Sequence, residues 1–327
     1  MTAFRRDPLG GSWHIVAPER MARPGAVQDA AASSCPFCPG NEDQTPPEIA
    51  RKTAEPGWSV RVIPNKYPAA DQSRRPEPPL PSLLEQAPGI GFHEVIIETP
   101  SHGHSIDTLA PSAMEQVVDT WIERIAHHWE NDRIKSVTLF KNSGRLSGAS
   151  IRHPHSQLLA LTVPTARAER EAAAATKWTD VRGTCLLCAL IEEELRVEDR
   201  IVAVSKSFVT LAPFASRFPY QLWVVPRRHQ RTPLEASQEQ RREIGRLMQS
   251  TSRAMRSRGA DNSFNWSFLL GPTGADGHWY IEAMPRITGQ GGFELSTENY
   301  INIVAPEAAA SSLRADFTEF QPRERTE

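Results

Sequence analysis

His153-Pro154-His155-Ser156-Gln157 runs directly into an apolar and partly β-branched segment, Leu158 to Val163. Such a segment is typical of a buried strand, and it places the polar residues at or near the start of that strand. Side chains two residues apart in a strand point to the same face, so His153, His155 and Gln157 would line one surface. One histidine could then bind a metal ion while the other stays free as a nucleophile. An isolated His-x-His in a solvent-facing turn is the alternative, and the rest of the chain decides between the two.

The composition excludes several classes of partner. The chain has 327 residues and a formal net charge of −2, which gives no reason to expect nucleic acid as a partner. No segment approaches the ~20 consecutive apolar residues of a membrane helix, and the N-terminus carries no apolar core of signal-peptide length. We therefore expect a cytoplasmic protein with no membrane partner.

The four cysteines form two pairs of the same spacing, Cys35-Pro36-Phe37-Cys38 and Cys185-Leu186-Leu187-Cys188. In a cytoplasmic chain this pattern favours zinc over a disulfide. One pair alone is a weak signal, but here every cysteine falls into such a pair. Each pair also begins a segment of the chain, and the two segments have the same order of predicted elements.

Each segment has the Cys-x-x-Cys, then strands, a strand that ends at a histidine, a long amphipathic helix, and a histidine that opens a later strand. The spacing from His102 to His153 nearly equals that from His229 to His278. We therefore predict an α+β fold of two pseudo-twofold halves, residues 1–178 and 179–327. Each half would be a mostly antiparallel sheet with packed helices.

The repeat also predicts two sets of metal ligands, since structural zinc commonly takes four Cys and His ligands. The alternative is reduced core cysteines with unrelated surface histidines. The first predicted set is Cys35, Cys38, His102 and His153, and the second is Cys185, Cys188, His229 and His278.

The two halves differ where chemistry would take place. His153-Pro154-His155 in the first half corresponds to His278-Trp279-Tyr280 in the second. A tyrosine replaces the free histidine, so we expect the first half to carry the nucleophile and the second to be a scaffold. A loop of small residues, 142–152, leads into the first histidine and would let backbone N–H groups approach a phosphate.

These motifs resemble the galactose-1-phosphate uridylyltransferase family of the histidine-triad superfamily. H-P-H-S-Q follows a loop with Asn142, Gly148 and Ser150, as in that family. The resemblance spans nearly the whole chain, and its further motifs, in order, are R-R-D-P-L-G-G-S-W-H-I-V-A-P-E-R-M-A-R-P, C-P-F-C-P-G-N-E, P-N-K-Y-P-A, H-E-V-I-I-E-T-P-S-H, V-P-R-R-H and G-G-F-E.

The resemblance implies two fused histidine-triad-like halves, a homodimer and ping-pong nucleotidyl transfer. His155 would attack the α-phosphorus of a nucleotide-sugar, and a sugar 1-phosphate would then accept the nucleotide. Gln157 would donate to a phosphoryl oxygen, while Ser150 and the backbone near Gly148 would stabilise the leaving phosphate. His153 would bind zinc and support the strand rather than act as part of a Lewis acid.

The resemblance also assigns the residues that hold the nucleotide. Asn65 and Asn142 match positions at the ribose or phosphate, and Arg20 and Arg23 match arginines expected at the nucleotide, from either subunit of a dimer. These residues extend the site beyond the H-P-H-S-Q motif.

The sequence departs from the family in three ways, and the first two leave the identity of the acceptor open. Thr288 and Tyr300 stand where a lysine and a glutamine hold the acceptor sugar phosphate in well-known members. The segment from Gly291 is closer to the ADP-glucose phosphorylase branch, which uses inorganic phosphate. Some members hold iron in the second metal site with a carboxylate and histidines, unlike the second cysteine set here. A non-catalytic zinc scaffold that binds a nucleotide is the alternative from another class.

Overall fold

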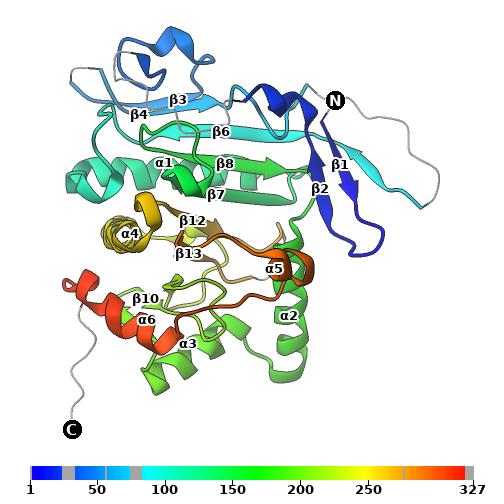
Figure 1. Cartoon of the computed structure of the whole chain (residues 1–327), viewed down its shortest axis with the longest axis vertical. Coiled ribbons are helices and arrows are strands. Elements are labelled where there is room, and N and C mark those ends of the chain that lie inside the picture. The colour runs from blue at the N-terminus through cyan, green and yellow to red at the C-terminus, as the bar shows by residue number, and fades with distance from the viewer. Residues whose placement is uncertain (1, 24–33, 56, 74–82, 275–276, 321–327) are drawn as a thin grey trace.

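The computed structural model of the chain describes all residues except 1, 24–33, 56, 74–82, 275–276 and 321–327. Its centre is one ten-stranded antiparallel sheet (Figure 1). The strands lie in the order β3 (Ala50–Thr53), β4 (Trp58–Pro64), β6 (Gly91–Ile97), β8 (His155–Leu161), β7 (Ser136–Ser143), β12 (Phe264–Leu269), β13 (Tyr280–Pro285), β11 (Leu222–Pro226), β10 (Phe208–Leu211) and β9 (Ile201–Val204).

The order of strands is mirrored about the middle of the sheet. Five strands come from each half, and the strand that follows the long helix in each half, β7 or β12, lies at the centre. Where they pair, Asn142 lies opposite Asn265 and Lys141 lies opposite Trp266. The predicted α+β class with two similar halves is therefore confirmed. The boundary at residue 178 stays a prediction, and α2 (Ala166–Arg182) runs across it.

Strand β8 differs from the prediction at its first residues. It begins at His155, so His155 and Gln157 share a face, but His153 lies before the strand. Pro154 has no N–H to donate to a strand ladder, which is why regular pairing starts after it. The expectation that His153 lines the strand surface with His155 and Gln157 was therefore wrong.

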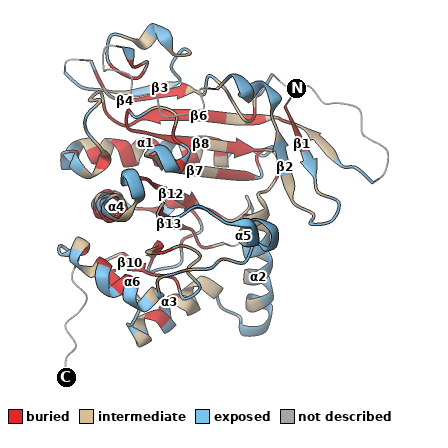
Figure 2. Ribbon diagram, viewed as in Figure 1, coloured by how far each residue is buried: buried red, intermediate tan, exposed pale blue. Residues whose placement is uncertain are grey.

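Two long helices pack on one face of the ten-stranded sheet. The strands at the centre are largely buried (Figure 2). One face holds the helices α1 (Pro111–Trp129) and α4 (Gln238–Arg258). A separate small sheet has the strand order β2 (Trp13–Val16), β1 (Ala3–Arg6) and β5 (Gln86–Pro88). The shorter helices are α3 (Leu186–Val197), α5 (Gly292–Thr297) and α6 (Pro306–Leu313).

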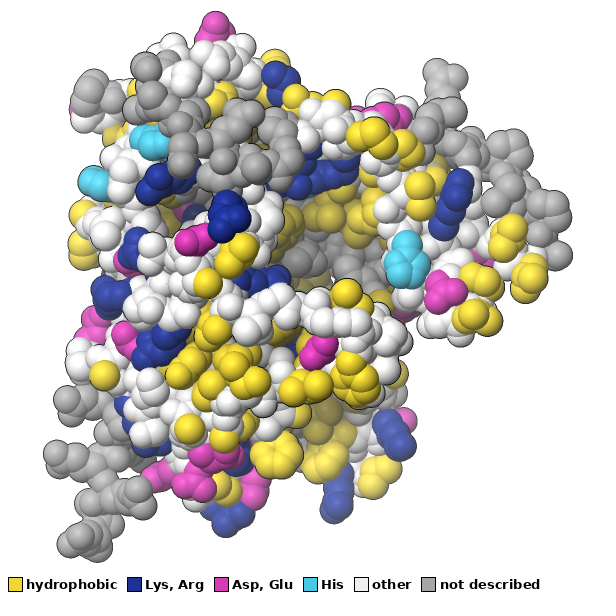
Figure 3. All heavy atoms as spheres, viewed as in Figure 1, with side chains coloured by type: hydrophobic (Ala, Val, Ile, Leu, Met, Phe, Trp, Pro, Cys, Tyr) yellow, Lys and Arg dark blue, Asp and Glu magenta, His cyan; other side chains and the backbone are white. Residues whose placement is uncertain are grey.

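Hydrophobic side chains gather around α5 on the face seen in Figure 3. The most exposed are Phe293 and Leu295 on the helix and Ile301 and Ile303 just after it, with 52 to 69% of each residue exposed. Exposed apolar residues this close together are typical of an interaction surface.

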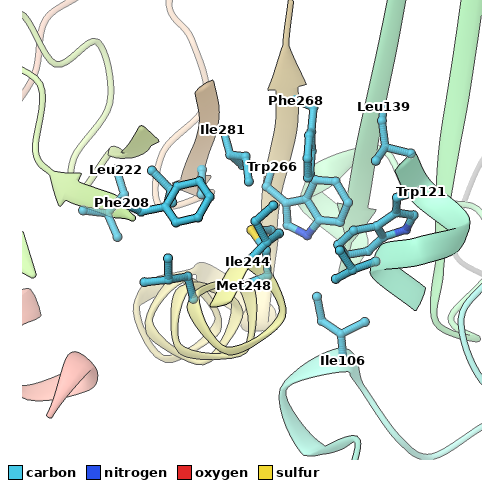
Figure 4. Packing of buried hydrophobic residues seen from close by; sticks show 14 of the residues in the cluster. Ile106, Trp121, Leu139, Phe208, Leu222, Ile244, Met248, Trp266, Phe268 and Ile281 are labelled. Carbon is cyan, nitrogen blue, oxygen red and sulfur yellow. The ribbon is translucent and has the colours of Figure 1, made fainter. Parts of the chain in front are cut away.

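The main hydrophobic core lies between the sheet and the helices α1 and α4 (Figure 4). Along α1, Val117, Trp121 and Ile125 recur at helical spacing and are fully buried. The Trp121 ring meets the ring of Trp266 from β12 at 4.9 Å between centroids. The core therefore joins the two halves rather than dividing between them.

Candidate active site and metal centres

The ring of His155 is fixed by a hydrogen bond to its own backbone segment. Its Nδ1 lies 2.8 Å from the carbonyl oxygen of His153, so Nδ1 carries the proton and donates. Nε2 then holds a free lone pair. Burial, and secondly the charge of Lys141, lowers the pKa of His155 to about 3, which keeps the imidazole neutral at pH 7. A neutral imidazole with a free nitrogen is a competent nucleophile toward phosphorus.

Lys141 supports His155 from the other side of the strand. Its Nζ donates to the His155 carbonyl oxygen at 2.9 Å and forms a buried ion pair with Glu98. Trp121 donates from its indole to the hydroxyl of Ser156 at 2.8 Å. These contacts hold the start of β8 in place, which fixes the position of the His155 ring.

Gln157 is oriented by His93, a residue that the sequence analysis did not select. The backbone N–H of Ala69 donates to His93 Nδ1 at 3.0 Å, so the His93 proton must be on Nε2. That Nε2–H donates to Gln157 Oε1 at 3.0 Å, and Asn65 donates to the same oxygen at 3.3 Å. The amide nitrogen of Gln157 is therefore left to face a ligand.

A pocket of about 260 Å³ lies along this face of β8. Gln157 and Leu159 line it, and His155 is the next residue of β8 on the same face. The other residues that line it are Ile15, Ala17, Arg20, Arg23, Ala69, His93, Phe140 and Asn142. The pocket brings together Arg20, Arg23, Asn142 and Gln157, as predicted, and Asn65 contacts its wall through Gln157.

The two arginines reach the pocket of their own chain. Arg20 donates to the carbonyl oxygen of Tyr67, and Arg23 donates to the carbonyl oxygen of Gly148 at 3.2 Å and to Ser150 Oγ at 3.3 Å. Neither arginine forms an ion pair within the described part of the chain. Uncompensated guanidinium groups beside a loop of small residues can bind phosphate.

The first predicted metal set is assembled. The ligand atoms of Cys35, Cys38, His102 and His153 all lie within 4.8 Å of one another. His153 Nδ1 is 3.7 Å from Cys35 Sγ and 3.5 Å from Cys38 Sγ. A tetrahedral zinc ion with its usual bond lengths needs S···N distances of about 3.5 Å. The Nε2–H of His153 donates to the carbonyl of Thr99 at 2.7 Å, which leaves Nδ1 as the ligand atom.

The second set repeats this arrangement with greater exposure. The ligand atoms of Cys185, Cys188, His229 and His278 also lie within 4.8 Å of one another, but only His278 is buried. His278 Nδ1 is 3.4 Å from Cys188 Sγ, and His278 Nε2 donates to the carbonyl of Pro226 at 3.1 Å. Both sets can hold a metal ion, and their donors suit zinc.

The second half has no free histidine at the place of His155. Tyr280 and Glu282 open β13 as His155 and Gln157 open β8. Arg167 of α2 donates to the Tyr280 hydroxyl at 2.8 Å and to the Glu282 carboxylate at 2.7 and 2.9 Å. Arg217 also pairs with Glu282 at 2.7 Å. The protein's own side chains therefore fill this part of the second half.

The two positions that depart from the family motif are also placed. Thr288 is exposed after β13. The ring of Tyr300 packs against Phe218, with centroids 5.4 Å apart, and the Arg217 guanidinium lies 5.5 Å from its centroid. Neither position presents a lysine or a glutamine.

The motifs and the geometry agree with comparisons to known proteins. Residues 1–164 match the family described as galactose-1-phosphate uridyl transferase, N-terminal domain, and residues 97–326 match a domain of unknown function, DUF4921. ADP-glucose phosphorylase from Arabidopsis thaliana is 30% identical over 330 residues, which cover 95% of this chain and 92% of that protein. Galactose-1-phosphate uridylyltransferase from Thermotoga maritima is 29% identical over 332 residues, with 96% and 98% covered.

Solved structures share the whole architecture. A uridylyltransferase mutant superimposes with a TM-score of 0.83 at 25% identity and covers 99% of this chain and 100% of that one. An ADP-glucose phosphorylase from Arabidopsis thaliana with bound ADP-glucose gives a TM-score of 0.76 at 30% identity, with 96% and 99% covered. The likeness extends through both halves, so the predicted fold of two similar halves is confirmed as the fold of these uridylyltransferase and phosphorylase structures. The chain belongs to the galactose-1-phosphate uridylyltransferase family.

Proposed function

We propose that this protein transfers a nucleoside monophosphate from a nucleotide-sugar to a phosphate-bearing acceptor through a covalent nucleotidyl-His155. The hydrogen bond from His155 Nδ1 to the His153 carbonyl carries this proposal, because it presents a neutral Nε2 lone pair beside the pocket. A non-catalytic scaffold has no need for a fixed tautomer, or for two arginines that line the pocket and form no ion pair among the described residues.

The reaction would proceed in two displacements at phosphorus. His155 Nε2 attacks the α-phosphorus, a P–N bond forms, and the P–O bond to the sugar 1-phosphate breaks. The acceptor phosphate oxygen then attacks the same phosphorus, and the P–N bond breaks to return neutral His155. In each displacement the leaving atom keeps the electron pair of the bond that breaks. No oxidation state changes, so the reaction requires no oxidant or reductant.

The residues around His155 would share the work of binding and charge stabilisation. Gln157 donates from its amide nitrogen to a phosphoryl oxygen, and Ser150 with the backbone at Gly148 stabilises the leaving phosphate. Arg20 and Arg23 bind the phosphates, and Asn65 and Asn142 hold the ribose or a phosphate.

Zinc would be held by the two Cys2His2 sets and would supply structural support rather than a reacting group. In the first set, the ring of His153 would bind the metal, while its carbonyl oxygen accepts the hydrogen bond from His155 Nδ1–H. Fixing His153 therefore fixes the tautomer of His155.

A hexose 1-phosphate is the acceptor in the first form of this proposal, as in a UDP-glucose–hexose-1-phosphate uridylyltransferase of galactose metabolism. Inorganic phosphate is the second candidate. Thr288 and Tyr300 favour it, because neither offers a cation or an amide to a sugar phosphate. The similarity to an ADP-glucose phosphorylase supports the same alternative.

The remaining expectations concern assembly and location. The apolar surface around α5 supports the proposed homodimer. The described residues contain no helix long and apolar enough to cross a bilayer. Four thiols arranged for metal binding fit the proposed cytoplasmic location, and we propose no nucleic-acid partner.

Intact mass after incubation with UDP-glucose or ADP-glucose tests the covalent step, and the adduct mass names the base. Wild type should gain one acid-labile nucleotide. His155→Ala should keep its metal and fold but gain none, while His127→Ala, which changes an exposed histidine on α1, should label normally. Labelling of His155→Ala, or no labelling of wild type with any nucleotide-sugar, contradicts the proposal.

The acceptor is tested on the isolated nucleotidyl-enzyme. The adduct is mixed separately with galactose 1-phosphate, glucose 1-phosphate, inorganic phosphate and buffer alone. Rapid loss with a sugar 1-phosphate supports the uridylyltransferase form, and loss with inorganic phosphate supports the phosphorylase form. Equal loss in buffer alone points to a hydrolase and rules out both.

A further inference from the structure

Asn265 of the second half makes direct contact with the candidate active site of the first half. It lies on β12, opposite Asn142 on β7, where the two halves of the sheet pair. Its Nδ2 donates to Asn142 Oδ1 at 2.7 Å and to the carbonyl oxygen of Ser147 at 3.1 Å. One amide thus contacts both the residue that lines the pocket and the loop that follows it.

Arg286 determines which way the Asn265 amide faces. Its Nε donates to Asn265 Oδ1 at 2.6 Å, so the amide oxygen must face Arg286 and the amide nitrogen must face Asn142. The guanidinium also packs over the ring of Phe218, 5.6 Å from the centroid. It forms no ion pair with any described residue, so its hydrogen bond to Asn265 is not shared with a carboxylate.

The orientation of Asn265 in turn determines that of Asn142. Because Asn142 Oδ1 accepts from Asn265, the donor group of Asn142 must face away from β12. Its Nδ2 lies on the side of Gly148, where a Cβ added to that glycine would be 4.0 Å away. Asn142 therefore presents N–H groups, rather than a carbonyl oxygen, toward the pocket and the loop that we assign to phosphate binding.

We propose that Asn265, held by Arg286, is a positioning residue for nucleotidyl transfer. The pair keeps the Asn142 amide turned with its donors toward the substrate phosphate. This inference rests on the proposed function and gives the second half a defined part in it. The half that lacks the nucleophile orients a donor in the half that has it.

Asn265→Asp tests the orientation directly, because the change is isosteric. A carboxylate at this position still accepts from Arg286 but cannot donate to Asn142 Oδ1. Asn142 would turn its amide to donate to the new carboxylate, which would point the Asn142 oxygen at the substrate phosphate. We expect nucleotidyl-His155 formation in a single turnover to slow by about 10²-fold, in a variant that circular dichroism shows to be folded.

The matched control is Asn302→Asp. Asn302 is also a half-buried asparagine of the second half, and its Nδ2 donates to the carbonyl oxygens of Ser216 and Phe218. It has no contact with the pocket. The same loss of donors should leave the adduct rate of Asn302→Asp within about twofold of wild type.

A double-mutant cycle separates positioning from a general structural effect. If Asn265 acts through Asn142, then Asn142→Ala with Asn265→Asp should be no slower than Asn142→Ala alone. Arg286→Lys, which keeps a donor, should retain the rate within about threefold, and Arg286→Met should not. The Arg286 pair also gives an answer if Asn265→Asp fails to fold.

Three results would overturn the inference: a wild-type adduct rate in Asn265→Asp, multiplicative losses in the double variant, or equal rates in Arg286→Met and Arg286→Lys. Each of them requires that wild type forms the adduct, so each leaves the proposed function standing. Absence of the adduct in wild type contradicts the proposed function itself and this inference with it.

Discussion

His155 and His93 show how single hydrogen bonds assign the roles of histidines. Each ring has one nitrogen fixed by the backbone: His155 Nδ1 by a carbonyl, and His93 Nδ1 by the N–H of Ala69. The first bond leaves a lone pair on the other nitrogen, and the second leaves a proton there. His155 can therefore attack, whereas His93 can only orient Gln157.

His93→Phe should slow nucleotidyl-His155 formation by about tenfold, because Gln157 loses the donor that holds its oxygen away from the pocket. Single-turnover quench measurements would show the loss. His127→Phe on α1 is the control for a histidine-to-phenylalanine change and should keep the wild-type rate. An unchanged rate in His93→Phe would mean that Asn65 alone orients Gln157.

His93 also makes a testable contribution to acid stability. Burial lowers the pKa of His93 to about 4, from 6.5 in the unfolded chain. Between these values the unfolded chain binds one more proton, so this contribution is complete above pH 6.5 and is lost as the pH falls toward 4. Urea unfolding should show that wild type loses about 2 kcal/mol more than His93→Phe between pH 7.5 and pH 5. Equal losses in both proteins would contradict the assignment.

At the scale of elements, the two sets of candidate metal ligands lie before strands with different roles in the proposed reaction. The first set includes His153, whose carbonyl holds His155 at the start of β8. The second set includes His278, before a strand that begins with Tyr280. Losing the first metal should therefore affect catalysis far more than losing the second.

Cys38→Ser and Cys188→Ser give a matched comparison of the two sets. Each should lower the bound zinc by about one ion per chain, measured by elemental analysis. Cys38→Ser should slow adduct formation by about 10- to 100-fold, whereas Cys188→Ser should retain the rate within about threefold. Equal rates in the two variants would show that the first metal does not support His155.

Local patterns predicted the elements well. The long amphipathic helix expected in the first half is present as α1 (Pro111–Trp129), because its apolar positions recur at helical spacing and Pro111 is its first residue. Both ligand sets followed from the repeated cysteine and histidine spacing. His93 and Asn265 were missed because their roles depend on which strands pair, β6 with β8 and β7 with β12, and nothing local to either residue specifies that pairing. The strand position of His153 was wrong because Pro154 delays pairing.

At the scale of the molecule, the two halves share one core and should unfold together. Trp266 of the second half is fully buried against Trp121 of the first. Trp266→Ala should lower the free energy of unfolding by about 3 to 5 kcal/mol, and urea transitions followed by far-UV and near-UV circular dichroism should still coincide. Two separated transitions would show that each half folds independently.

The pairing of β7 with β12 has a consequence for how the chain can change over time. Without its partner, either strand would be an open edge with unsatisfied N–H and C=O groups, ready to pair with other chains and aggregate. The second half can therefore carry Tyr280 in place of a nucleophile, but its deletion would leave β7 as an open edge. Substitutions that break the pairing of β7 with β12 should therefore be excluded, because they would expose the edge of both halves of the sheet.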